Sequence, residues 1–264
     1  MVAAEADVVV AGGGPAGLAT AIGARRAGLE VVVLEAQRPP IDKACGEGLM
    51  PDGAAVLAAL GVELAPEAAR PFRGVRYIDG AIVAEGRFPG APGLGIRRTA
   101  LHEALRRRAE AVGARLRWGC RVTGLLPDGF ATDRGPVRGR WLAAADGRGS
   151  GLRSLAGLGG RPAALRRFGV RRHFRVVPWS DLVEVHWTAG CEAYVTPVGE
   201  DLVGVAMLWS GGAARFDELL ARFPALAERL AGAEIASKDR GAGPLAQRCR
   251  RVARGRLALV GDAA

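Results

Sequence analysis

Two uninterrupted apolar runs lie near the start of the chain. Residues 8–11 (Val-Val-Val-Ala) and 31–34 (Val-Val-Val-Leu) contain no polar position, which is typical of strands buried on both faces of a parallel sheet. Between them, residues 18–28 are rich in alanine and follow a helical period, and Gly28 is a typical helix end. The pattern therefore predicts a β-α-β unit at the N-terminus.

Helical and strand-like patterns follow this unit along the rest of the chain. Helical spacing of apolar residues predicts a helix at 99–112 and another at 216–230, which Pro224 interrupts. Apolar or alternating runs predict strands at 74–78, 81–86, 116–126, 130–132, 137–145, 169–177, 182–187, 193–197, 202–209 and 256–260. The helical and the β-rich segments interleave, so we expect an α/β nucleotide-binding domain with a β-rich domain inserted through it. We expect the first domain over 1–72, 97–165 and 250–264, and the second over 73–96 and 166–249.

The turn after the first apolar run has the pattern Gly12-x-Gly14-x-x-Gly17, with Pro15 and Ala16 inside it. Glycines at these positions permit a tight turn and a close approach of backbone N–H groups to a phosphate, next to a helix N-terminus. Glu35 ends the second apolar run, where an acid can accept hydrogen bonds from ribose hydroxyls. A carboxylate there favours FAD or NAD over NADP, whose 2′-phosphate it would repel.

Two later motifs carry a family resemblance. Residues 146–153 read Asp146-Gly147-x-x-Ser-x-x-Arg, and residues 256–264 end in Gly261-Asp262-Ala-Ala. Together with the glycine-rich turn, they resemble the motifs of FAD-dependent oxidoreductases of the p-hydroxybenzoate hydroxylase-like superfamily. Residues 43–51, which contain Cys45 and Gly46, are similar to the cysteine- and glycine-rich loop of its geranylgeranyl reductase branch. The Tyr-x-Trp-x-Phe-Pro pattern of the lipid reductases is replaced here by a Tyr-Val-Thr-Pro stretch at 194–197.

The resemblance implies a Rossmann-like FAD-binding domain of the GR2 type with an interleaved β-rich substrate domain. In this family the first of the two motifs contacts the FAD pyrophosphate region, and the aspartate of the second binds the ribityl chain. An arginine at the start of a helix, here Arg98, faces the flavin, and a strand residue, here Val122, touches the adenine. The cofactor-binding residues that we expect are Gly12, Gly14, Pro15, Ala16, Gly17, Glu35, Cys45, Gly46, Arg98, Val122, Asp146, Gly147, Gly261 and Asp262.

The expected activity follows from the same resemblance. We expect an FAD-dependent oxidoreductase that takes electrons from NAD(P)H and either hydroxylates a hydrophobic or aromatic small molecule or reduces one of its C=C bonds. A nicotinamide-only Rossmann dehydrogenase shares the first motif and is the alternative enzyme. A third alternative is an inactive FAD-binding fragment, because the resembling family continues past the aspartate of its last motif. No catalytic residue and no metal ligand is assigned.

Charge and composition modify this interpretation only slightly. The formal net charge is +10, and only Lys43 and Lys238 are lysines, so the basic residues are almost all arginines. We interpret the arginines, including Arg171 and Arg172, as parts of solvated faces, and expect no nucleic-acid partner because no recognition motif is present. Weak contact with an anionic membrane surface is compatible with this charge. Four distant cysteines, the lack of a signal peptide and the lack of a long apolar segment favour a cytoplasmic protein without disulfides or bound metal.

Overall fold

The first apolar run forms the central strand of an eight-stranded mixed sheet in the computed structural model, which describes residues 4–160 and 166–264. Strand β1 (Ala6–Ala11) lies parallel to β2 (Val31–Glu35) on one side and to β11 (Val137–Ala144) on the other. The sheet continues with β8 (Arg115–Trp118), β19 (Leu257–Leu259), β18 (Ala253–Arg254), β9 (Val122–Leu126) and β10 (Gly129–Thr132). The predicted β-α-β unit is confirmed.

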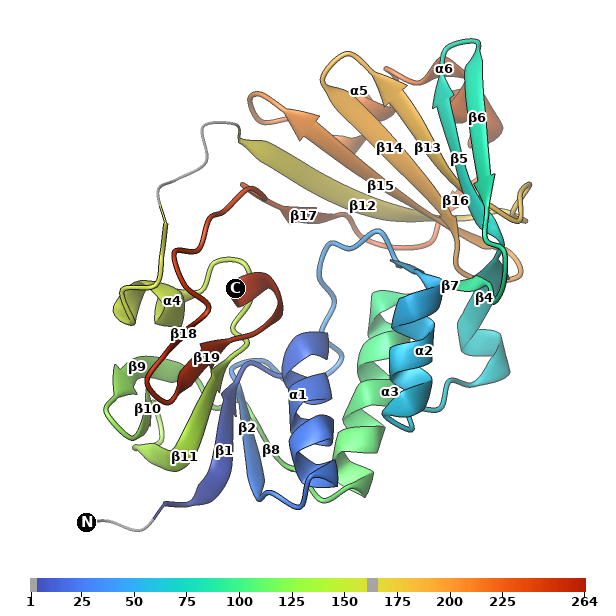
Figure 1. The fold of residues 1–264 in the computed structure, drawn as a ribbon. Coiled ribbons are helices and arrows are strands. Elements are labelled where there is room, and N and C mark those ends of the chain that lie inside the picture. The colour runs from blue at the N-terminus through green and yellow to red at the C-terminus, as the bar shows by residue number, and fades with distance from the viewer. Residues whose placement is uncertain (1–3, 161–165) are drawn as a thin grey trace.

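Both faces of this sheet are covered, which explains the uninterrupted apolar runs. Helices α1 (Pro15–Arg26) and α3 (Arg98–Ala111) pack side by side on one face and bury Val8 and Val10 (Figure 1). On the other face, α4 (Gly151–Leu155) and the β9–β10 hairpin bury Val9. Successive strand residues therefore enter different cores, as the alternation of side chains along a strand requires.

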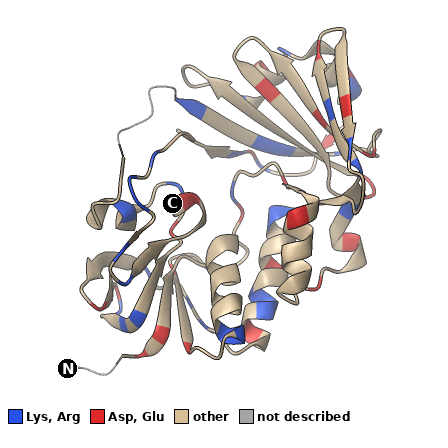
Figure 2. Cartoon of the chain, viewed as in Figure 1, with Lys and Arg blue, Asp and Glu red and all other residues tan. Residues whose placement is uncertain are grey.

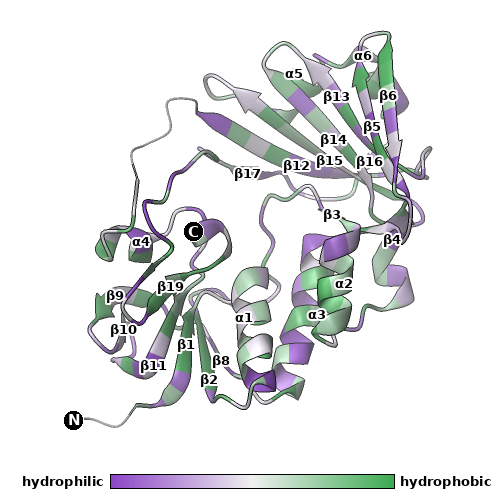
Figure 3. Ribbon diagram, viewed as in Figure 1, coloured by the Kyte–Doolittle hydropathy of each residue, from purple (hydrophilic) through white to green (hydrophobic). Residues whose placement is uncertain are grey.

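A second eight-stranded sheet forms the β-rich part of the chain. Its main order is β16-β12-β15-β14-β13-β5-β6, and β17 pairs with β12. The strands are β5 (Gly74–Asp79), β6 (Ile82–Arg87), β12 (Arg167–Arg175), β13 (Val183–Thr188), β14 (Cys191–Pro197), β15 (Leu202–Ser210), β16 (Glu234–Ile235) and β17 (Arg240–Ala242). One face packs against α5 (Phe216–Leu220) and α6 (Pro224–Arg229) around an apolar cluster (Figure 3).

A small third sheet lies where the two larger sheets meet. Strand β7 (Gly93–Ile96) pairs with β3 (Gly48–Leu49) on one side and with β4 (Ala69–Phe72) on the other. A Cβ on Gly95 would lie 1.8 Å from the carbonyl oxygen of Pro197 in β14, so glycine permits this contact. The α/β class with an interleaved β-rich part is confirmed. The exact domain boundaries stay a proposal, and the one at residue 165 lies outside the described residues.

Several details of the chain differ from the predicted pattern, among them α4 and the short strands β3, β4, β7, β16, β17 and β18, which were not predicted. The helix predicted at 216–230 is two short helices, because Pro224 starts α6 instead of continuing α5. Helix α2 (Pro51–Ala59), together with the short 3-10 helix Pro66–Ala68, was not predicted. Leu57 is the one residue of α2 that is buried, so its sequence has little helical periodicity to detect.

The charges are distributed over both parts of the molecule. Figure 2 shows acidic side chains interspersed among the basic ones. Arg106, for example, bonds to Glu103 and Glu110 on the exposed face of α3. The expectation that Arg171 and Arg172 are solvated is wrong: their residues are 1% and 8% exposed. They lie on β12, whose two faces are both covered over much of its length.

Candidate functional site

The glycine-rich turn joins β1 to α1 with no space for side chains. Gly12 has φ +110°, and a Cβ there would lie 2.2 Å from the carbonyl oxygen of Ala145. A Cβ on Gly17 would lie 1.9 Å from the carbonyl oxygen of Gly12. Gly17 is therefore required for helix–strand packing, whereas Gly12 is required for the turn itself.

Two buried side chains fix the backbone of this turn. The carboxylate of Glu35 accepts hydrogen bonds from the N–H groups of Gly13 and Gln37, each at 2.9 Å. Nε2 of His102, on α3, lies 2.9 Å from the carbonyl oxygen of Gly13, which can only accept. Burial lowers the pKa of His102, so its neutral ring donates this bond near neutral pH. Sequence analysis predicted Glu35 but missed His102, for which the sequence offers no pattern.

The Asp146 motif is a capped turn at the end of β11. The Asp146 carboxylate accepts hydrogen bonds from Ser150 Oγ at 2.6 Å and from the N–H of Leu152 at 3.2 Å. Ser150 in turn caps α4 by accepting the N–H of Arg153 at 2.9 Å. The Arg153 guanidinium donates to the carbonyl oxygen of Ala263 at 3.1 Å. This arginine thus ties the second motif to the third.

The third motif reaches the glycine-rich turn directly. Gly261 has φ +61°, and a Cβ there would lie 2.5 Å from Cβ of Ala16. Glycine is needed at this position both for its backbone conformation and for the close approach to α1. Asp262 follows it and is exposed. The structure therefore brings all three motifs of the sequence to one edge of the parallel sheet.

A groove runs between these motifs. It consists of two adjoining pockets of about 480 Å³ and about 330 Å³ that share Gly14, Lys43, Ala145 and Asp146. The larger part is also lined by Pro15, Ala16, Arg98, Gly147, Gly261 and Asp262, and the smaller part by Gly12, Glu35 and Val122. Eleven of the expected cofactor-binding residues line the groove, and three, Gly17, Cys45 and Gly46, do not.

Several basic residues line the groove that the motif comparison did not predict. Lys43 belongs to both parts, Arg121 to the smaller part, and Arg148 and Arg240 to the larger part. Arg240 comes from β17 of the second sheet, so both large sheets contribute to the groove. Lys43 is the first residue of the stretch 43–51 that resembles the cysteine- and glycine-rich loop. This position is the one signal in the sequence that could have identified it.

The residues of the groove fit an extended, anionic dinucleotide. Backbone rather than side chains forms the wall at Gly14, Gly147 and Gly261, which leaves room for a ligand and exposes polar backbone groups to it. Arg98 lines the groove, and its buried Nε has no hydrogen-bond partner among the described residues. A bound group with acceptor oxygens would satisfy this nitrogen. Within the described ranges, no group of three or more His, Cys, Asp or Glu side chains could hold a metal ion.

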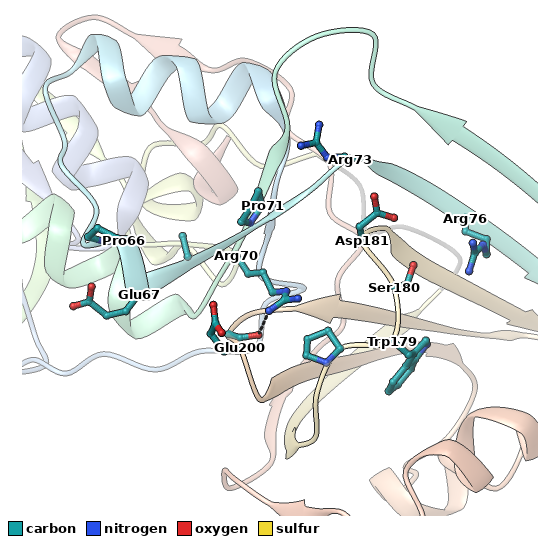
Figure 4. Close-up of a pocket in the computed structure, with 13 residues that line it drawn as sticks. Pro66, Glu67, Arg70, Pro71, Arg73, Arg76, Trp179, Ser180, Asp181 and Glu200 are labelled. Carbon is teal, nitrogen blue, oxygen red and sulfur yellow. Dashed lines mark hydrogen bonds between the residues drawn. The ribbon is translucent and has the colours of Figure 1, made fainter.

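A further pocket, of about 700 Å³, lies apart from the groove and shares no lining residue with it. Figure 4 shows that its labelled side chains come from the 3-10 helix at 66–68, from β4, β5 and the residue between them, from the segment before β13, and from the turn between β14 and β15. Arg70, Arg73 and Arg76 line this pocket, as do Glu67, Asp181 and Glu200. The basic and acidic groups balance, so the pocket has no excess charge that would select an anion.

No helix in the described part of the chain is long and apolar enough to cross a bilayer. All four cysteines are free thiols. Burial raises the pKa of the Cys191 thiol, which keeps it protonated and unreactive at neutral pH. Cys45 is half-buried, and its Sγ lies 3.4 Å from the N–H of Glu47.

Comparison with known proteins identifies related sequences. The profile of a family described as "FAD binding domain" matches residues 5–200. A protein named menaquinone reductase from Mycobacterium tuberculosis (strain ATCC 25618 / H37Rv) is 36% identical over 178 residues. That match covers 66% of this chain and 42% of the relative. The alignment therefore spans less than half of the relative's length.

Two solved structures illustrate the similarity of fold. A flavoprotein/dehydrogenase from Cytophaga hutchinsonii superposes with a TM-score of 0.84 at 19% identity, covering 98% of this chain and 71% of the other. A geranylgeranyl bacteriochlorophyll reductase-like protein from Thermoplasma acidophilum gives a TM-score of 0.81 at 22% identity, with 98% and 71% coverage. At these identities the similarity shows a shared fold.

Proposed function

This chain belongs to the FAD binding domain family, and from that membership we propose that the whole protein is an FAD-dependent reductase of a hydrophobic small molecule. The observation that carries the proposal is the 36% identity over 178 residues to a protein named menaquinone reductase. The family match favours FAD as the cofactor over the nicotinamide-only alternative. When bound, FAD supplies the hydride and electron transfer chemistry that protein side chains lack.

The groove supports an assignment of residues along FAD. We propose that the adenosine part occupies the smaller pocket, where Glu35 faces ribose hydroxyls and Val122 lies beside adenine. The larger pocket then holds the pyrophosphate near Gly14 and the flavin end near Arg98 and Asp262. Lys43 lines both pockets at their junction, where a cation favours the pyrophosphate charge. Cys45 and Gly46 remain candidates for flavin contact beyond the lining of the groove.

A hydrophobic substrate is supported by the face of the second sheet opposite α5 and α6, which is exposed at Tyr77 and Trp187 and buried at Val185. Strand register places Tyr77, Val185 and Tyr194 in one row across β5, β13 and β14, and Trp187 two residues beyond Val185 on the same face. The rings of Tyr77 and Trp187 meet edge to face, with their centroids 6.1 Å apart, and the two residues are 48% and 50% exposed.

This face of the second sheet is the one directed toward the groove. The row continues to Arg171 of β12, whose side chain meets the segment around Asp42. The opposite face is closed by α5 and α6. Exposed aromatic side chains on the side of the cofactor suit an apolar ring or chain such as a prenylated quinone.

To test the proposal, FAD is added to the 264-residue chain and to any longer protein encoded in the same reading frame that aligns with the full length of the relative. Each is mixed with NADH or NADPH and menaquinone, once without oxygen and once in air, and the products are analysed by mass spectrometry. A product heavier by two hydrogens supports the reductase. A product heavier by one oxygen, formed in air alone, supports a hydroxylase instead. If neither form consumes NAD(P)H with any quinone, the proposed reaction is wrong.

The proposed substrate also bears on where the protein acts. We propose a cytoplasmic protein that meets its apolar substrate at the membrane surface, where its arginine-rich exterior is attracted to anionic lipid. Co-sedimentation with vesicles of phosphatidylglycerol, compared with vesicles of phosphatidylcholine, tests this contact. Equal recovery in both pellets would contradict it.

A further inference from the structure

A polar cluster joins the segment 42–48 to strand β12; Asp42 lines the groove, whereas Glu47, Arg171 and His173 are buried beside it. The Glu47 carboxylate lies 2.5 Å from Nε2 of His173, and their side chains are 1% and 0% exposed. Arg171, also 1% exposed, bonds to Asp42 and lies 3.8 Å from Glu47. Although burial raises the pKa of Asp42, hydrogen bonds and charge from Arg240 and Arg171 bring it below its usual value. The cluster is therefore a network of charges removed from water and paired with one another.

The backbone at Glu47 is unusual. Its φ is +59°, and it is the one non-glycine residue with positive φ in the described part of the chain. Glycine would adopt this conformation at lower cost, and glycines occupy both neighbouring positions, 46 and 48. A buried carboxylate on strained backbone is maintained by its contacts, which indicates that the side chain itself is used.

The hydrogen-bond partners of His173 indicate which of its ring nitrogens carries the proton. Its Nδ1 lies 3.0 Å from a terminal guanidinium nitrogen of Arg171, which can only donate, so Nδ1 accepts. Ser237 Oγ lies 2.8 Å from the same nitrogen. The ring proton is therefore on Nε2 and is donated to Glu47. Because Arg171 occupies Nδ1, the ring is suited to holding Glu47 in place rather than to accepting a proton from Ser237.

The second oxygen of the carboxylate connects the cluster to the groove. Oε1 of Glu47 accepts the N–H of Arg98 at 2.8 Å, at the first residue of α3. The carbonyl oxygen of Glu47 accepts the N–H of Ile96 at 2.8 Å. No side-chain hydrogen bond caps α3 at its preceding residue, Arg97. Glu47 thus satisfies a backbone donor at the helix start from which the Arg98 side chain enters the groove.

We propose that Glu47 is a positioning residue for the FAD site: held by His173 of the second sheet, it fixes the start of α3 and thereby the Arg98 side chain at the flavin end of the groove. The proposal makes cofactor affinity depend on a contact between the two large sheets. It rests on FAD as the cofactor and is independent of the proposed substrate.

The test measures FAD affinity by quenching of flavin fluorescence, together with the visible flavin spectrum and the melting temperature. Glu47→Gln keeps the shape but has one acceptor oxygen in place of two, so its NH2 group opposes either Nε2–H of His173 or the N–H of Arg98. We expect FAD to bind at least about tenfold more weakly, about 1.4 kcal/mol, with a shifted flavin spectrum at temperatures where the protein is folded. Glu184→Gln is the matched control. Glu184 is also buried and bonds to a histidine, His186, but none of its hydrogen-bond partners lines the groove.

A second pair of variants tests the role of the imidazole. His173→Gln keeps a donor toward Glu47 and is expected to retain FAD affinity within about threefold, whereas His173→Leu is expected to lose it as Glu47→Gln does. Wild-type affinity in Glu47→Gln, or equal loss in Glu184→Gln, overturns the proposal. If Glu47→Gln does not fold, the two His173 variants provide the test. Equal FAD affinities of His173→Gln and His173→Leu then overturn the proposal. Loss of quinone reduction with unchanged FAD affinity would concern the proposed reaction alone.

Discussion

Helix α1 contains two glycines whose replacement by alanine is expected to have opposite effects. Gly17 is buried at the start of the helix, and its added Cβ would lie 1.9 Å from the Gly12 carbonyl oxygen, against 3.4 Å for an ordinary contact. The neighbouring atom is backbone, so the turn or the helix must move by about 1.5 Å. Gly23 is exposed in the same helix, and its Cβ would meet no atom within 4 Å.

The magnitudes follow from these distances. Overpacking a tight site costs about 1–3 kcal/mol, and one kcal/mol shifts the melting temperature of a chain of this size by about 2–4 °C. We therefore expect Gly17→Ala to melt about 2–12 °C lower than the wild type. Gly23→Ala removes backbone freedom from the unfolded chain and gains about 0.5–1 kcal/mol. Its melting temperature is expected to rise by about 1–4 °C.

Thermal melting with and without FAD measures both effects, and flavin fluorescence gives the affinity. Gly17→Ala is expected to bind FAD more weakly as well, because the displaced turn contains Gly12 and Gly14, which line the groove. Gly23→Ala is expected to keep wild-type affinity. The reasoning is refuted if Gly17→Ala melts at the wild-type temperature with unchanged affinity, or if the two variants are destabilised equally.

Three further outcomes are expected. Ser150→Ala removes the cap of α4 and the bond to Asp146; it should cost about 1 kcal/mol in urea unfolding, and an unchanged midpoint would contradict the capping role. Burial raises the pKa of Glu184, but hydrogen bonds from His186 and Trp179 dominate and lower it to about 2. The stability that Glu184 contributes is then present above about pH 4.5 and lost toward pH 2, so Glu184→Gln should reduce the fall in the free energy of unfolding over this range of pH. Burial and Glu192 raise the pKa of Tyr194 to about 12; absorbance near 295 nm should show a late phenol ionisation that Tyr194→Phe abolishes.

Sequence patterns predicted those elements whose structure depends on residues close together along the chain. The apolar runs at 8–11 and 31–34 predicted two parallel strands, because burial on both faces removes every polar position. Helix α2 was not predicted, because its single buried residue, Leu57, produces no periodic pattern. The family resemblance of the motifs, rather than a local pattern, implied most of the residues that line the groove.

Contacts between distant segments could not be predicted in this way. His102 meets Gly13, and His173 meets Glu47, only because sheets and helices far apart in sequence pack together. Composition even favoured the wrong environment for Arg171, since arginine is exposed in most proteins. A buried arginine between strands resembles its solvated neighbours in sequence, and only its three-dimensional partners distinguish it.

The junction of Gly261 with Ala16 has a consequence for biosynthesis. One wall of the cofactor groove comes from β1 and α1, and the other from residues near 260, which are synthesised later. A nascent chain that has completed β1, α1 and β2 therefore displays a half-formed groove until β19 pairs with β11. Flavin uptake then has to wait until residues near 260 have been synthesised, and retention of the cofactor reports that β19 has docked.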